Sequence, residues 1–172
     1  MEKVKITAEH KQLLPSVENF DSYEFYIAAN PDHEFDCPVA LIVAAQIIRN
    51  WVGFSVSITS TSRPHDTFGF HRTDEAIDLL SASTIHGEPP PKEPAEVLEE
   101  FKEECLSYIS GTGSKLIEDL RKAGVTGFGV EQVCIHLDCR TNSFGRRDAY
   151  GQYMVFEYKQ DKNGKILVNK AL

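Results

Sequence analysis

Three residues, His71, Asp78 and His136, have the types and local contexts to hold a metal ion together. Asp78 interrupts the apolar run AIDLL, where a buried carboxylate costs free energy unless it is paired or metal-bound. His71 lies shortly before that run, in the segment FGFH. His136 belongs to the run VCIHLDCR, whose alternation predicts a strand with Cys134, His136 and Asp138 on one face. The sequence therefore predicts one His/Asp/His cluster.

This ligand set predicts zinc rather than calcium or magnesium. Two of the three ligands are imidazoles, which suit zinc-like ions better than oxygen-seeking cations. Three protein ligands leave a fourth position open, as in catalytic zinc sites, whereas structural sites are closed by four ligands. Each residue alone also has an ordinary interpretation: His71 as a turn histidine, Asp78 as a carboxylate bonded to backbone at a strand end, and His136 as a half-buried side chain.

Two predicted strands and a polar turn place the first two ligands. Phe54, Val56 and Ile58 alternate with hydroxyl residues, which predicts a half-buried strand. A polar turn containing Arg63 follows, and AIDLL predicts the second strand. Arg63 could face a substrate carboxylate or carbonyl from this turn, or lie in solvent. His65 and Asp66 belong to the same turn. Either could also face a substrate or lie in solvent.

Helices are predicted on either side of these strands. A helix over residues 39–51 is apolar nearly all round, with Asp36 as its expected N-cap and Gly53 as its end. Amphipathic patterns predict helices from Glu96 to Ile109 and over residues 114–123, the latter ended by Gly124. Residues 1–35 show an irregular pattern, in which YEFYIAA fits either a strand or a helix, and SASTIHGEPPPKEP predicts a loop.

The element order predicts an α+β fold with a mainly antiparallel central sheet flanked by helices. At 172 residues the chain is expected to form a single domain, with a core over about 36–140. A C-terminal hairpin is expected over about 152–169, where YMVFEYK and KILVN flank a DKNG turn.

Composition limits the partners and the compartment. A net charge of −8 argues against nucleic-acid binding, and no apolar run is long enough to cross a bilayer. The first residues, MEKVKITAEHKQLL, lack the apolar region of a signal peptide. We therefore expect a cytoplasmic protein, or one released by lysis or carried in a virion if a phage encodes it. The four cysteines form no CxxC pair, and Cys134 is either a small buried hydrophobe or a neighbour of the metal.

The segments SITSTSRP, HRTDEAID and IHLDCR together resemble the M15 family of zinc D-Ala-D-Ala carboxypeptidases, whose fold is shared with the Hedgehog signalling domain. The resemblance covers roughly Asp36 to Arg140. It implies that Arg63 contacts the substrate, that His71, Asp78 and His136 bind zinc, and that peptidoglycan stem peptides or similar short peptides are hydrolysed.

Two positions depart from the family pattern. Asp74 stands where the family prefers glycine, and Val133 stands three residues before His136, where many members carry the catalytic acid. Glu131 is the nearest acid upstream of Val133 and becomes the predicted acid/base if a turn or bulge brings it to the metal face. Asp138 could orient His136 or serve only the strand.

Three functions are therefore compared. The first is a zinc peptidase or amidase. The second is a non-catalytic binding or virion-associated module that retains the fold and the metal. The third is a metal-free structural protein. Oligomeric state is left open by the sequence.

Overall fold

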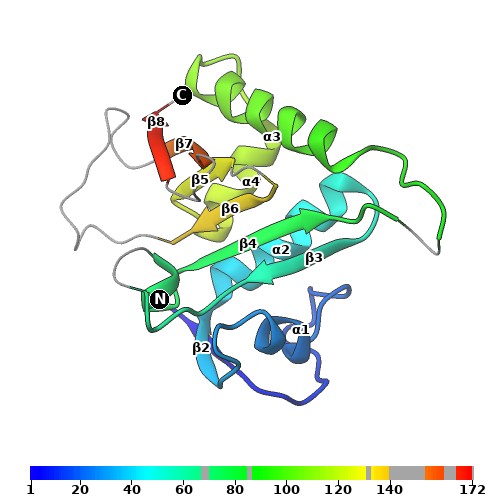
Figure 1. The fold of residues 1–172 in the computed structure, drawn as a ribbon, viewed down its shortest axis with the longest axis vertical. Helices are drawn as coiled ribbons and strands as arrows, with labels where there is room; N and C mark the ends of the chain where they lie inside the picture. The colour runs from blue at the N-terminus through cyan, green and yellow to red at the C-terminus, as the bar shows by residue number, and fades with distance from the viewer. Residues whose placement is uncertain (67–69, 85–86, 131–132, 140–153, 161–165, 172) are drawn as a thin grey trace.

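The structure is a computed structural model that describes residues 1–66, 70–84, 87–130, 133–139, 154–160 and 166–171 (Figure 1). Its main sheet has six strands in the order β3-β4-β6-β5-β7-β8. Neighbouring strands are antiparallel except for the parallel pair β5–β7. The strands are β3 (Val56–Ser60), β4 (Ala76–Ser81), β5 (Gly127–Val130), β6 (Ile135–Asp138), β7 (Met154–Gln160) and β8 (Ile166–Ala171). The predicted α+β class with a mainly antiparallel sheet is confirmed.

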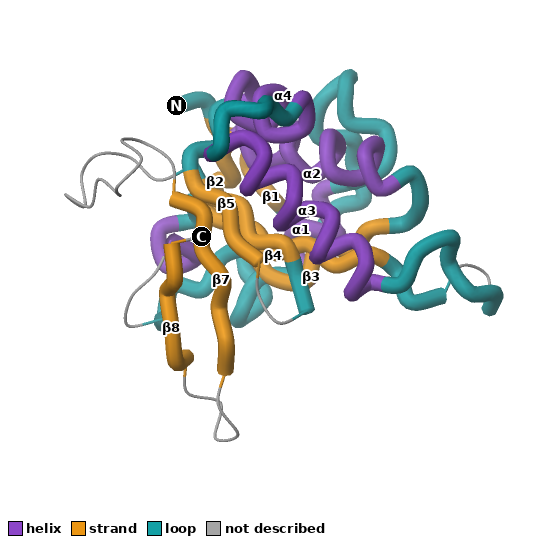
Figure 2. The backbone as a smooth tube through the Cα atoms, turned by 90° about the horizontal axis from the view of Figure 1, so that it is seen from above, coloured by secondary structure: helices purple, strands orange, loops and turns teal. Residues whose placement is uncertain are grey.

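Helices α2 (Val39–Val52) and α3 (Pro94–Ile109) pack against one face of this sheet, and α4 (Lys115–Ala123) packs against these two helices (Figure 2). Ile77 and Leu79 of β4, with Ile135 and Leu137 of β6, belong to the hydrophobic core on that side. Successive side chains of a strand point to opposite faces. Asp78 and His136 therefore lie on the other face of the same two strands, away from the core.

The predicted helix ends agree with the structure at three points and differ at two. Gly53 and Gly124 end α2 and α4 in the left-handed conformation, with φ of 83° and 106°, and Ser114 caps α4 through its hydroxyl. Pro94 opens α3 slightly earlier than predicted. Asp36 is not the N-cap of α2, because it lies in strand β2 (Phe35–Pro38), paired with β1.

Residues 1–35, irregular in pattern, contain regular elements. Strand β1 (Lys3–Ile6) pairs antiparallel with β2, and YEFYIAA contributes to the short helix α1 (Ser22–Ile27). Asp21 caps α1 in a capping box with Glu24. The backbone N–H of Thr61 donates to the carbonyl oxygen of Ala28 at 3.0 Å. The N-terminal segment therefore braces the turn that carries Arg63.

The predicted C-terminal hairpin is present as β7 and β8, an antiparallel pair that joins the main sheet beside β5. Its expected DKNG turn lies outside the described residues. The GFGV segment, expected only to lead into the ligand strand, is itself strand β5. None of the helices in the described part of the chain is long and apolar enough to cross a membrane.

Candidate metal centre

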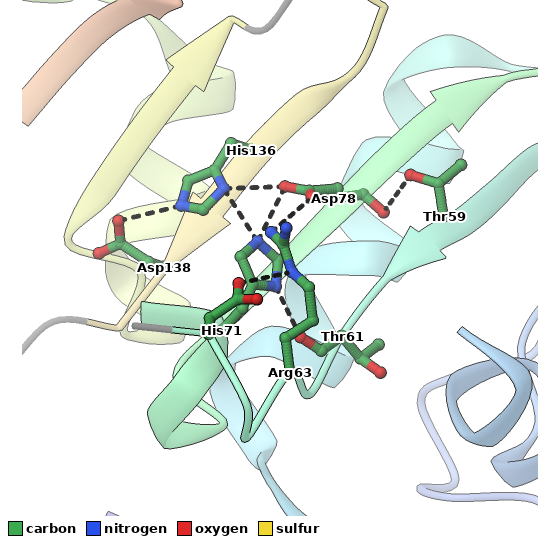
Figure 3. A network of polar contacts seen from close by, with 8 residues as sticks. Thr59, Thr61, Arg63, His71, Asp78, His136 and Asp138 are labelled. Carbon is green, nitrogen blue, oxygen red and sulfur yellow. Dashed lines mark hydrogen bonds and ion pairs between the residues drawn. The ribbon is translucent and has the colours of Figure 1, made fainter. Parts of the chain in front are cut away.

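Strand register places Asp78 directly beside His136. In the antiparallel pair β4–β6 these two residues are opposite one another, so both side chains leave the sheet on one face. The 3-10 turn η1 (Phe70–Thr73), just before β4, carries His71 to the same point (Figure 3). All three residues are buried. Residues separated along the chain thus meet at one point, as the sequence predicts.

The three side chains approach one another through one atom each. Nε2 of His71 lies 3.2 Å from Oδ1 of Asp78 and 3.3 Å from Nδ1 of His136. Nδ1 of His136 lies 2.8 Å from Oδ1 of Asp78. These atoms form a closed triangle that could hold a metal ion.

The other nitrogen of each imidazole faces an oxygen outside the triangle. Nδ1 of His71 lies 2.6 Å from the carbonyl oxygen of Thr61, which can only accept, so this nitrogen carries a proton. Nε2 of His136 lies 3.4 Å from Oδ2 of Asp138. Both contacts favour a proton on the outer nitrogen of the ring, which leaves the inner nitrogen facing the triangle, as metal-bound histidines require.

Three acceptor atoms cannot remain this close without a positive charge between them. In the metal-free protein that charge is a proton on His136. Burial opposes this charge, but the carboxylates of Asp138 and Asp78 outweigh burial and raise the pKa of His136 to about 10. Burial likewise raises the pKa of Asp78, yet bonds to His136 and His71 prevail, and its pKa lies well below the usual range. A metal cation would replace the proton.

The triangle has dimensions suitable for a tetrahedral ion. Zinc–nitrogen and zinc–oxygen bonds of about 2.0–2.2 Å at tetrahedral angles separate neighbouring ligand atoms by about 3.3–3.6 Å. Two sides of the triangle, at 3.2 and 3.3 Å, are close to that spacing, and the third, at 2.8 Å, is shorter. The donor set fits an ion with one further position.

Arg63 lies at the edge of the cluster. Its terminal nitrogen is 3.5 Å from Oδ2 of Asp78, the carboxylate oxygen that is not part of the triangle. Its Nε is buried and lacks a hydrogen bond among the described residues, with Oδ2 of Asp66 3.5 Å away. The side chain is 31% exposed. The guanidinium therefore contacts both the ligand carboxylate and solvent.

The remaining predicted residues have different outcomes. Glu131, the predicted acid/base, lies outside the described residues. Val133 is 61% exposed and projects toward solvent. Cys134 is buried and is not among the converging ligand atoms. Asp74, where the resemblance expects glycine, adopts φ of 60°, a left-handed conformation that aspartate tolerates better than most residues.

Sequence reasoning missed two contributors. Thr61 acts through its backbone carbonyl, which any residue type could supply, so no sequence signal marks it. Gly127 lies opposite Asp138 in the β5–β6 register, and a Cβ there would fall 2.2–2.4 Å from the Asp138 carboxylate. The glycines of GFGV were the available signal, because glycine inside a strand often marks close approach of another group.

Two hollows lie away from the cluster. One, of about 370 Å³, is lined by the N-terminal segment, including His10 and Asp21. The other, of about 400 Å³, is bordered by α2 and α4, including Trp51 and Lys115. Neither is lined by a residue of the His/Asp/His cluster. Size alone is thus a poorer guide to chemistry here than the convergence of ligand atoms.

Comparison with known proteins adds no relative to these observations. The chain matches no protein-family model, no curated protein and no solved structure. Any function must therefore be argued from the cluster itself, a buried His71–Asp78–His136 group that could hold a metal ion.

Proposed function

We propose that this chain is a zinc-dependent peptidase or amidase that hydrolyses peptidoglycan stem peptides or similar short peptides. We further propose that its fold is of the kind shared by the M15 peptidases and the Hedgehog domain. The observation that carries the proposal is the convergence of one potential ligand atom each from His71, Asp78 and His136 within 2.8–3.3 Å.

The order and context of the motifs support the fold assignment. The expected arginine follows the first strand of the main sheet, the first ligand pair spans η1 and β4, and the last ligand lies in β6. Asp74 keeps the left-handed backbone that a glycine would readily adopt at that turn. These features support the resemblance at the level of local structure.

The metal ligands, Arg63 and Glu131 have different roles in the proposed reaction. His71, Asp78 and His136 would hold the ion, and zinc, when bound, polarises a carbonyl and lowers the pKa of a water molecule. Arg63 would orient the substrate, because its planar fork suits a carboxylate or carbonyl group. Glu131 is the proposed general base. Donor chemistry alone does not select zinc among first-row ions, so the metal should be identified before activity is assayed.

Arg63 is best tested by separating binding from turnover. If its guanidinium holds a substrate carboxylate, Arg63→Ala should raise KM and lower kcat/KM, and Arg63→Lys should recover only part of the loss. His65→Ala is the matched control, since His65 belongs to the same turn and is exposed. Equal effects of both alanine variants would assign the loss to the turn rather than to the guanidinium.

A second candidate is a metal-retaining binding module without catalysis, such as a virion-associated component. Val133 favours it, because an exposed valine at the family's usual acid position cannot transfer a proton. This candidate predicts zinc-dependent binding to cell-wall fragments without release of products.

Digestion of purified peptidoglycan and of D-Ala-D-Ala-ended peptides separates the two candidates. The peptidase predicts product release that a chelator abolishes and zinc restores. Glu131→Gln should keep the metal and the fold but lose about 10²–10⁴-fold in rate, the usual contribution of a general base. Binding without turnover, together with new turnover in Val133→Glu, would favour the module that lacks its acid. Unchanged turnover in Glu131→Gln would reassign the base.

A further inference from the structure

We propose that Asp138 is a positioning residue that holds a proton on Nε2 of His136 and so directs Nδ1 toward Asp78 and His71, with Gly127 providing the space for its carboxylate. The consequence for the metal rests on the function proposed above. The placement of the proton does not, because it depends only on described residues.

Burial makes Asp138 unsuited to an incidental surface role. Its side chain is completely inaccessible to solvent, although it is a carboxylate. Burying a carboxylate costs free energy unless polar partners compensate. Nε2 of His136, itself buried, lies 3.4 Å from Oδ2 of Asp138 (Figure 3). The two residues are two positions apart in β6, so both side chains lie on the metal face.

Gly127 explains how the carboxylate reaches this position. It is the β5 residue opposite Asp138, and both carboxylate oxygens lie where its Cβ would be, at 2.2 and 2.3 Å. Real Cβ contacts are never so short, so a larger residue at position 127 would force the carboxylate to move. The Asp138 side chain therefore lies over the β5 backbone at Gly127, where no side chain occupies the space, and its carboxylate faces His136.

This arrangement assigns different tasks to the two nitrogens of His136. An ionised carboxylate can only accept a hydrogen bond, so it favours N–H at Nε2. Nδ1, which is 2.8 Å from Oδ1 of Asp78, is then the nitrogen whose proton a metal ion could replace. With a metal ion in the triangle, a proton on Nδ1 would block the ligand position and would leave Nε2 and the Asp138 carboxylate facing each other as two acceptors. Asp138 and Asp78 therefore hold the ring from opposite sides.

Nitrogen NMR of ¹⁵N-histidine-labelled protein tests the proton placement at fixed pH without metal. The wild type should show a slowly exchanging proton on Nε2 of His136. Asp138→Ala should lose this protected signal, whereas Asp138→Asn should retain it, because the amide oxygen still accepts. Asp74→Asn is the matched control, since the Asp74 side chain accepts from Ser62 and contacts no ligand side chain, and its backbone bond to His71 is kept in the variant. It should leave the signal unchanged.

Zinc affinity, measured by competition with a chromophoric chelator, tests the consequence. Loss of such an outer partner typically weakens metal binding by about 10–100-fold. Asp138→Ala should show a loss of that size, Asp138→Asn a smaller one, and Asp74→Asn none. If wild type retains the Nε2 proton but binds no zinc, the proposed function fails and the proton placement stands.

A double-mutant cycle tests the part assigned to Gly127. Gly127→Ala should lower the melting temperature of the wild type by crowding the carboxylate, and should have a clearly smaller effect in the Asp138→Ala background, where that space is vacant. Additive effects would remove Gly127 from the proposal. An Nε2 signal that is missing in wild type, or that Asp138→Ala leaves unchanged, would overturn the proposal itself.

Discussion

Two histidine–aspartate pairs in this molecule have nearly the same contact geometry and very different surroundings. Nδ1 of His136 lies 2.8 Å from Asp78, and Nδ1 of His10 lies 2.7 Å from Asp21. The side chains of the first pair are 6% and 7% exposed, and those of the second pair are 68% and 31% exposed. A short contact between these residue types is therefore no sign of function by itself.

The difference is in what completes each pair. Asp21 is satisfied as the N-cap of α1, accepting the backbone N–H of Glu24, and it needs no third ligand. Asp78 meets a second histidine instead of a backbone donor on the same oxygen. The buried His136–Asp78 pair, with His71 as a third ligand residue, is stabilised by a cation at the cluster. Water screens the charges of the exposed His10–Asp21 pair instead.

The largest contrast should appear in metal content. His71→Ala or His136→Ala should abolish retention of about one zinc ion per chain, because two ligands cannot keep the ion against a chelator. His10→Ala should leave the content unchanged. Elemental analysis of zinc-supplemented, desalted protein measures this. Equal loss in all three variants would mean adventitious surface binding.

The next contrast is in how zinc affinity depends on pH. Metal must displace the proton of His136, whose pKa is raised to about 10, so zinc affinity should rise about tenfold per pH unit below that value. His10→Ala should leave this slope unchanged. Competition titrations over several pH values measure it, and an affinity independent of pH would contradict a proton held at the ligand position.

The stability of the metal-free protein should fall as pH rises, whereas zinc affinity should increase. A group whose pKa is raised on folding contributes fully below its unfolded pKa, here about 6.5, and that contribution is lost as pH rises toward 10. Chemical denaturation with chelator present should therefore show stability falling over this window. His136→Gln, which cannot carry the proton, should remove most of that fall.

Removal of metal should lower stability without unfolding the chain. Zinc at about a thousandfold above its Kd adds about 4 kcal/mol, roughly 8–16 °C in Tm for a domain of this size. The core formed by the sheet and α2 does not include the cluster, so the fold should persist. Circular dichroism with chelator checks this, and complete loss of helix signal under mild conditions would refute it.

The smallest effect is expected at the exposed pair. His10→Ala should change the free energy of unfolding by about 0–1 kcal/mol, because solvent-exposed ion pairs contribute little. Denaturant titration at low and high salt measures it. A larger loss, comparable with that of Asp78→Ala, would remove the distinction between the two regions.

Much of the site could be predicted from sequence because its positions follow strand alternation. Asp78 within an apolar run and His136 between apolar neighbours are visible as exceptions to a pattern. An acid shortly before Pro38 is typical of helix starts, so the local sequence predicts Asp36 as a helix cap. Pairing with β1, a long-range contact, decided otherwise. Local sequence also cannot reveal that Gly127 lies opposite Asp138, since that depends on strand register.

The most direct test of the central claim is the X-ray absorption spectrum of the zinc-loaded protein. The account predicts only nitrogen and oxygen ligands at about 2.0–2.2 Å, with outer-shell scattering from two imidazoles that His71→Ala and His136→Ala remove. A sulfur ligand at about 2.3 Å would place the ion on a cysteine instead. That result, or failure to load zinc at all, would contradict a metal centre built from His71, Asp78 and His136.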